Sequence, residues 1–410
     1  MNLNPNPVFI ISKNLRTRHR NSKIWRSIFF LSTALAILVL IVLILSIVNQ
    51  AFGFVLIKNT VEPGELSSIP LEQLTKPALI KILKSNLTSN RYKTIDRELP
   101  FTARNQEELV DLVTSEIVEP TVVESYHLDV SIFDKEKILA EAAQKHPDAR
   151  LEFRAWINSS FINRSMSSTP ELAGVRTAIF GSLWIILITI AVAFPIGVGA
   201  AIYLEEYAGH NRINRIIQTN IDNLAGVPSI IYGILGLAIF VRGLGFFTSG
   251  AFLGNGETGG RTILSAGFTM GLLTLPILII NAQEAIRAVP NSLRQASYGI
   301  GATKWQTIWH HVLPSALPGI LTGTILAVSR AIGETAPLIL VGASSFINKD
   351  PSGVFSRFTA LPIQIYNWTT RPQAEFRNIA AAAILVLLIL LLSLNAFAII
   401  MRNRFVRRIS

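Results

Sequence analysis

The sequence contains no cysteine among its 410 residues, so it forms no disulfide bond and offers no thiolate to a metal. It also lacks three common catalytic patterns: a phosphate-binding loop ending in Gly-Lys-Ser/Thr, a His-Glu-x-x-His metal helix and a Gly-x-Ser-x-Gly nucleophile elbow. We therefore expect no enzyme, no catalytic residue, no metal site and no cofactor. Any uphill transport would draw its energy from a partner or an ion gradient.

Long apolar runs are what the chain has instead. Half of the residues are hydrophobic, only 15% are charged, and the mean hydropathy is +0.44. Several runs reach about 20 residues, the length needed to cross a bilayer as a helix. The pattern predicts an all-α membrane protein with six transmembrane helices. The expected spans are 27–48, 173–203, 223–241, 262–282, 317–341 and 379–401.

Basic residues gather at the two ends of the chain, in segments 1–26 and 402–410. Because Lys and Arg are enriched in cytoplasmic loops of membrane proteins, we predict that both termini are cytoplasmic. The first apolar run is too long for a cleaved signal peptide, and no small-residue cleavage site follows it. The isoelectric point is about 10.0, and many of the basic residues flank the predicted spans. Membrane topology therefore accounts for the basic character, and we expect no nucleic-acid partner.

Residues 49–165 are too long to be a simple connection between two spans. Residues 57–160 hold 17 of the 26 acidic residues of the chain. We predict an inserted extracytoplasmic domain of α+β or helical type, and we find no catalytic constellation in it. Its last part, 151–161, is rich in aromatic residues and is expected on the membrane surface.

A polar loop, residues 283–316, is called the elbow below. Two capping boxes are expected in it, Ser292 with Gln295 and Thr303 with Gln306, each starting a short helix. A glycine break between the two helices, which includes Gly301, gives the loop its bend.

The second helix of the elbow is expected to carry an apolar ridge on one face and to end at Pro314. The ridge residues follow helical spacing and are Trp305, Ile308, Trp309 and Val312. An exposed ridge of this kind suits a groove on a partner protein. The alternative is that the ridge packs against helices of its own chain.

The predicted fifth span, 317–341, carries Arg330 and Glu334 four residues apart, on one helix face. A charge near the centre of a bilayer costs about 2.5–3.5 kcal/mol on insertion scales. We therefore expect both side chains midway along the span and facing inward, in a solute path. A purely structural ion pair is the alternative.

The elbow resembles the cytoplasmic signature of bacterial ATP-binding-cassette importer permeases. That signature is Glu-Ala-Ala, three residues, Gly, and Leu-Pro twelve residues on. Here it stands as Gln295-Ala296-Ser297, then Gly301, then Leu313-Pro314, with Gln in place of Glu and Ser in place of the second Ala. The resemblance implies coupling to an ATPase. The coupling residues it marks are Gln295, Ala296, Gly301, Trp305, Ile308, Trp309, Leu313 and Pro314.

Other segments are similar to the A-type permease of phosphate importers. They are Pro170–Gly174, Ala200–Tyr207, Asn223–Gly233 and Ser329–Leu338. The resemblance covers a permease core at 166–401 and implies a type I importer permease in the bacterial plasma (inner) membrane. The implied partners are a second permease, an ATPase dimer, an extracytoplasmic phosphate-binding protein and membrane lipid. Arg330, Glu334 and Thr335 are the implied path residues.

Other functions stay open at this point. The same machine could carry sulfate, molybdate or an organic solute, although the planar donor fork of Arg330 suits an oxyanion. A secondary transporter or channel is less favoured, because such folds usually show internal repeats and none is seen. A scaffold or sensor built on residues 50–165 is weakened by the lack of any site-like cluster there.

Overall fold

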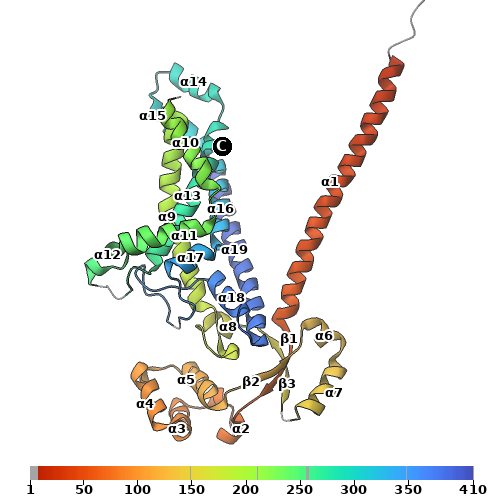
Figure 1. The fold of residues 1–410 in the computed structure, drawn as a ribbon, viewed down its shortest axis with the longest axis vertical. Coiled ribbons are helices and arrows are strands. Elements are labelled where there is room, and N and C mark those ends of the chain that lie inside the picture. Colours follow the sequence, from red (N-terminus) through yellow and green to blue (C-terminus); the bar gives the residue numbers. More distant parts are fainter. Residues whose placement is uncertain (1–7, 148, 210, 255–257, 348, 410) are drawn as a thin grey trace, which may run out of the picture.

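The computed structural model describes residues 8–147, 149–209, 211–254, 258–347 and 349–409. Residues 1–7 of the basic N-terminal segment and residue 410 of the basic tail lie outside the described residues. Figure 1 shows a bundle of long helices, a smaller domain at one end of it, and a single helix that leaves the bundle at an angle.

That single helix, α1, runs from Val8 to Ala51 without a break. It contains the predicted first span, 27–48, and begins well before it. Its apolar half is open: Phe30 is 73% exposed and Leu35 is 61% exposed. Only its last turns pack against protein, in a core shared with α19, Ala374–Ile409. Such a helix is stable only where lipid or a partner covers its apolar surface.

Within the described residues, five helices are long and apolar enough to cross a membrane, and a bent pair of helices makes a sixth candidate. The predicted class, an all-α membrane protein with an inserted domain, is confirmed. The five long helices are 17–51, 176–207, 263–287, 304–332 and 374–404.

The inserted domain is built on a three-stranded antiparallel sheet. Strand β1, Phe52–Lys58, follows α1 directly and lies between β2, Thr121–Ser125, and β3, Arg150–Ala155. Val55 pairs with Ser125 on one side and with Glu152 on the other. Of the two types left open for this domain, α+β is therefore the observed one.

Short helices complete the inserted domain. The helices are α2 Pro63–Leu66, α3 Lys76–Asn86, α4 Ser89–Glu98, α5 Gln106–Val113, α6 Leu128–Phe133, α7 Lys135–Lys145 and α8 Ser159–Asn163. Helices α3 to α5 enclose their own apolar core, which includes Leu79, Leu83 and Leu109, all 0% exposed.

Two of the three aromatic residues in segment 151–161 are buried within the protein, whereas Phe153 is 50% exposed. The segment forms β3 and the start of α8, and its Trp156 and Phe161 are 3% and 4% exposed. Both pack with Trp368 of α18, Leu361–Thr369, and with α19. These side chains join the inserted domain to the bundle, so burial within the protein takes the place of a lipid contact.

The bundle is organised around α13, Ile263–Arg287, which packs against α9, Arg176–Ile202, and α16, Leu313–Ile332. Glycines allow the close approach. A Cβ added to Gly267 would come within 2.5 Å of Ile188 on α9. Small residues of this kind let membrane helices pack closely without a hydrophobic driving force.

The predicted third span, 223–241, is broken in the structure. Helix α10, Arg212–Ala225, and helix α11, Ser229–Gly236, meet at an angle of 106°, and α11 continues as a π-helical stretch to Gly243. Pro228 at the break cannot donate a backbone hydrogen bond, and the residue before a proline avoids the helical conformation. A short helix, α12, Gly245–Thr248, follows.

The predicted fifth span, 317–341, has different ends. It begins in the elbow, because α15, Lys304–Thr307, runs through a π-helical turn into α16. Pro314 therefore does not end the helix. The π turn places the amide of Leu313 on the carbonyl of Ile308, and Pro314 then stands in the first turn of α16, where its missing N–H is tolerated.

At its other end the span stops early. Helix α16 ends at Ile332 with Gly333 as its C-cap, and α17, Ala336–Val341, starts separately after Thr335 with Pro337 in its first turn. Figure 1 places the C-terminus and the elbow helices at one end of the bundle and the inserted domain at the opposite end.

Candidate functional site

The elbow contains two short helices, one on each side of a glycine turn. Helix α14 is Asn291–Gly299 and α15 follows after Thr303. Gly301 has φ +87°, a left-handed conformation that suits glycine. A hydrogen bond of 2.8 Å between the hydroxyls of Ser297 and Thr307 joins the two helices. The elbow is thus a defined unit and not a loose loop.

One of the two predicted capping boxes is present. Thr303 accepts from the amide of Gln306, and the Gln306 side chain accepts from the amide of Thr303. The box expected at Ser292 is wrong. Helix α14 begins at Asn291, directly after Pro290, and has no side-chain cap, so Ser292 already lies inside the first turn.

The apolar ridge divides into an exposed part and a buried part. Trp305 and Trp309 stack with ring centroids 5.5 Å apart, and they are 57% and 53% exposed. Ile308 and Val312, each 1% exposed, are buried against the bundle. The prediction of an exposed ridge that includes Ile308 is therefore wrong. The four residues span a wide arc of the helix, and one edge of that arc faces the core.

The other residues marked in the elbow lie around this pair. Gln295 and Ala296 are exposed on α14, and Gly301 is exposed at the turn. Leu313 and Pro314 are half-buried at the start of α16. A hollow of about 340 Å³ lies beside them, lined by Ile300, Gly301, Ala302, Gln306, His310 and His311.

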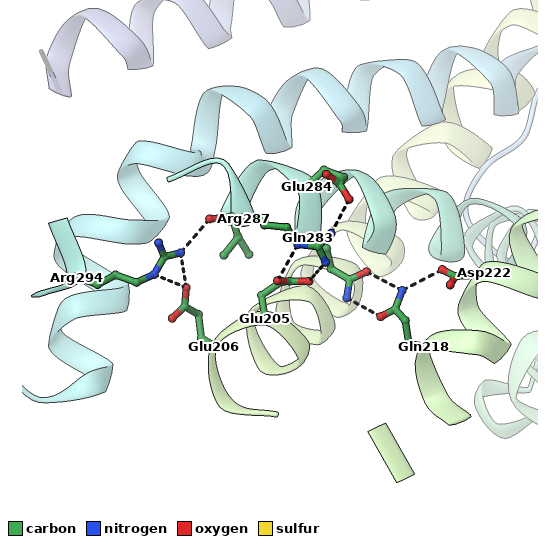
Figure 2. Close-up of polar contacts among 9 residues, drawn as sticks. Glu205, Glu206, Gln218, Asp222, Gln283, Glu284, Arg287 and Arg294 are labelled. Atoms are coloured by element: carbon green, nitrogen blue, oxygen red, sulfur yellow. Dashed lines mark hydrogen bonds and ion pairs between the residues drawn. The ribbon is translucent and has the colours of Figure 1, made fainter. Parts of the chain in front are cut away.

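A buried ion pair holds the elbow to the bundle, as Figure 2 shows. The guanidinium of Arg294 on α14 lies 2.7 Å from the carboxylate of Glu206, which follows α9 in a π-helical turn, 203–207. Only 14% and 6% of these side chains are exposed. Arg294 also donates to the carbonyls of Val289, at 2.6 Å, and Ile286, at 3.0 Å. One side chain thereby connects α14, the end of α13 and the end of α9.

The sequence did not identify Arg294 as a functional residue. The position of Glu206, directly after an apolar run, is compatible with either a solvated turn or a part of the cytoplasmic surface. A solvated turn is excluded by the burial of Glu206. The available signal was the Glu-Glu pair at the end of an apolar run, facing a basic loop. That signal does not say which arginine pairs with which glutamate.

A second, more open layer of polar contacts lies next to this pair in Figure 2. Arg287 at the end of α13 reaches Glu205 at 2.6 Å and Glu284 at 3.0 Å, and 59% of the Arg287 side chain is exposed. Gln283 and Gln218 exchange hydrogen bonds of 2.8 and 3.3 Å, which tie α13 to α10. These contacts bring α9, α10 and α13 together behind the elbow.

The second candidate group lies at the other end of α16. The Nε atom of Arg330 is 3.5 Å from Glu334, and 56% and 19% of their side chains are exposed. Arg330 lies in the last turn of α16, where a cation is favoured by the helix dipole. Glu334 and the half-buried Thr335 lie in the break before α17.

The expected geometry of this group is corrected on one point. Arg330 is not midway along a continuous helix that also carries Glu334, because the helix ends between them at Ile332. More than half of the Arg330 side chain is exposed, so its own chain does not enclose it. The prediction that the two charges meet is nevertheless consistent with the 3.5 Å separation.

Comparison with known proteins places these features in a family. The model of the family described as "Binding-protein-dependent transport system inner membrane component" matches residues 193–410, which include the elbow and both candidate groups. The inserted domain precedes the match.

Individual relatives agree with this match. The chain is 31% identical over 254 residues to the probable ABC transporter permease protein YqgI of Bacillus subtilis, covering 58% of this chain and 82% of that protein. It is 38% identical over 238 residues to the phosphate transport system permease protein PstA 1 of Mycobacterium tuberculosis, covering 57% and 72%. It is 32% identical over 236 residues to the phosphate transport system permease protein PstA of Yersinia pestis, covering 57% and 74%.

Proposed function

Because the chain belongs to the family of binding-protein-dependent transport system inner membrane components, we propose that it is the transmembrane permease subunit of an ATP-driven importer of inorganic phosphate. Its fold is that of a type I ABC importer permease with an inserted α+β domain. The observation that carries the choice of phosphate is the 38% identity to a phosphate transport permease over 238 residues. The chain itself is a permease, and ATP hydrolysis belongs to a partner ATPase dimer.

The elbow is the docking element for that ATPase. Its two stacked tryptophans, Trp305 and Trp309, expose apolar surface at the elbow end of the bundle. Exposed aromatic surface of this kind is typical of protein–protein contacts. Gln295, Ala296 and Gly301 are exposed in the same elbow. Ile308 is buried and fixes this helix to the bundle. Leu313 and Pro314, the first residues of α16, connect the elbow to that helix.

Arg330, Glu334 and Thr335 form the anion contact of the solute path. The ion pair at 3.5 Å leaves guanidinium donors of Arg330 available for a second partner. An oxyanion accepts two hydrogen bonds from such a fork. Hydrogen phosphate also carries an O–H that can donate a hydrogen bond to the Glu334 carboxylate, whereas sulfate has none and would meet the carboxylate as a second anion. Glu334 therefore selects by repulsion.

The orientation follows from the same assignment. The elbow end of the bundle and both termini of the chain face the cytoplasm, and the inserted domain lies outside. The arrangement in Figure 1, with the C-terminus beside the elbow helices and the inserted domain at the far end, supports this orientation. A second permease completes the path, and a phosphate-binding protein delivers the anion on the outer side.

The test is transport by the whole complex, purified through a tag on this chain and placed in lipid vesicles. ATP is supplied on the elbow side, and the binding protein with labelled phosphate on the other side. We expect ATP-dependent phosphate uptake that excess sulfate or molybdate does not inhibit. Uptake of sulfate, molybdate or an organic solute in place of phosphate would overturn the substrate. Purification without an ATPase would overturn the mechanism.

A further inference from the structure

Helix α10 has three different faces, although it is only 14 residues long. One face packs against the bundle. The residues on it are Asn214, Gln218, Ile221 and Ala225, all at least partly buried. Gln218 on this face makes the reciprocal hydrogen bonds with Gln283 of α13. This pair places Gln218 next to the last turns of α13.

A second face is exposed and mostly apolar. Its large side chains are Ile213, Ile216, Ile217 and Leu224, between 39% and 67% exposed. At 100° per residue, these positions lie together on one side of the helix, away from the packed face. Lipid or an apolar protein surface is a suitable neighbour for them.

The third face is exposed and polar. Its residues are Arg215, Thr219 and Asp222. They follow one another at intervals of four and three residues, so they form a continuous stripe that is separate from the apolar face. The Asp222 carboxylate accepts a hydrogen bond of 2.9 Å from the Gln218 amide, and the rest of the stripe is open in the described residues of this chain.

The stripe extends to the level of the membrane. Helix α10 starts at the elbow end, whereas α13 ends there, so the two helices run in opposite directions. Asp222 lies four residues beyond Gln218, about 6 Å further from the elbow at 1.5 Å per residue. It therefore lies alongside the apolar part of α13. Polar and ionised side chains at this depth face water or protein and not lipid.

The open end of the stripe leads to the Arg330 group. Helix α10 bends into α11, and the hydroxyl of Tyr232 on α11 donates to the carbonyl of Leu224 across the bend at 2.7 Å. Helix α11 packs against α17, where a Cβ on Gly233 would lie 2.7 Å from Pro337. Since α17 starts directly after Thr335, α11 and α17 together connect the end of α10 to the break that holds Glu334.

We propose that the polar stripe of α10 lines the water-filled half of the solute path between the Arg330 group and the elbow end. The occupant of this surface is water and the hydrated oxyanion. The inference rests on the proposed function, because it needs a path. The stripe carries one charge of each sign, Arg215 and Asp222, so it has no net positive charge that would retain the anion.

The absence of cysteine allows a direct test. Single cysteines are placed on the polar, apolar and packed faces, two per face, at Thr219, Asp222, Ile217, Leu224, Ile221 and Ala225. The assembled complex in lipid vesicles is treated with a charged, membrane-impermeant methanethiosulfonate reagent, and the rate of modification is measured. Co-purification of the ATPase establishes the assembly of each variant, and two positions per face keep a comparison if one variant does not assemble.

We expect Thr219→Cys and Asp222→Cys to react at least about tenfold faster than Ile217→Cys and Leu224→Cys, because the reactive thiolate forms in water and is disfavoured in apolar surroundings. The packed positions should be slowest. Equal rates on all faces, or faster reaction on the apolar face, would overturn the proposal. Polar-face cysteines that react in the isolated chain but not in the complex would show that the second permease covers the stripe, which also overturns it.

The two proposals fail separately. Labelling does not depend on which solute the complex carries, so uptake of another anion with the expected labelling pattern would overturn phosphate alone. Normal phosphate uptake with an unreactive stripe would overturn the stripe alone.

Discussion

Two arginine–glutamate pairs of the same chemistry lie in opposite surroundings. Arg294 and Glu206 are 2.7 Å apart, nearly buried, and come from positions 88 residues apart in the chain. Arg330 and Glu334 are 3.5 Å apart, and more than half of the arginine side chain is exposed. In the first pair, backbone carbonyls take up further arginine donors. The comparison teaches that Arg294, whose donors are satisfied inside the protein, holds helices together as a clamp with Glu206, whereas the exposed Arg330 keeps donors that a second partner can use.

Breaking the buried pair should have the largest effect. Glu206→Ala leaves Arg294 as an uncompensated buried charge, and removing one partner of such a pair costs about 3–5 kcal/mol. We expect a clearly lower melting temperature of the purified permease and loss of the ATPase during purification. The exchange Glu206→Arg with Arg294→Glu restores both charges and should recover part of the loss. Wild-type melting and assembly in Glu206→Ala would contradict the clamp.

A change at Gly301 tests whether the elbow couples ATP hydrolysis to transport. Its φ of +87° is unfavourable for residues with a Cβ, above all for a β-branched one. Gly301→Val should leave the complex able to hydrolyse ATP but unable to couple hydrolysis to uptake. Gly301→Asn is the matched control, because asparagine tolerates the left-handed region better. Full assembly and full uptake in Gly301→Val would argue against the elbow as the coupling element.

The exposed pair Arg330–Glu334 is called the open pair below. Changes in it should affect transport and not stability, the opposite of the clamp. Arg330→Gln is expected to assemble and melt like the wild type but to lose phosphate uptake, because the bidentate donor is gone. Arg330→Lys keeps the charge without the planar fork and should retain partial uptake. Normal uptake in Arg330→Gln would remove Arg330 from the solute path.

The contrast between the pairs also explains what sequence reasoning could reach. The apolar runs revealed the long helices, because hydrophobic length is a local property of the chain. The capping box at Thr303 was equally local, and it is present. The box at Ser292 failed because Pro290 starts the helix earlier.

Features that depend on tertiary contacts could not be predicted in this way. The pairing of Glu206 with Arg294 depends on where α9 and α14 end in space. The burial of Ile308 depends on which edge of a helix meets the core, and periodicity does not say where the boundary falls. The aromatic segment with Trp156 and Phe161 was assigned to the membrane surface because exposed and buried aromatics look alike in sequence.

A narrower change within the open pair concerns selectivity. Glu334→Gln removes the carboxylate that repels sulfate, yet it keeps an oxygen that can accept a hydrogen bond from the phosphate O–H. We expect phosphate uptake to persist while sulfate becomes a competitor, so the phosphate-over-sulfate preference falls. The measurement is inhibition of labelled phosphate uptake by sulfate in the reconstituted complex. An unchanged preference would leave Arg330 as an anion contact and assign selectivity to the binding protein.

The smallest effect is expected at a third ion pair, between Arg287 and Glu205, which lies next to the clamp. Its distance of 2.6 Å is as short as that of the buried pair, but 59% of the Arg287 side chain is exposed. Exposed pairs contribute only about 0.2–1 kcal/mol, and salt screens them. Arg287→Gln should therefore lower the melting temperature slightly at low salt and almost not at all at high salt. Arg294→Gln, the matched change in the buried pair, should be strongly destabilising at both salt concentrations. If Arg287→Gln were as destabilising as Arg294→Gln and equally insensitive to salt, burial would not be what distinguishes the clamp from its neighbours.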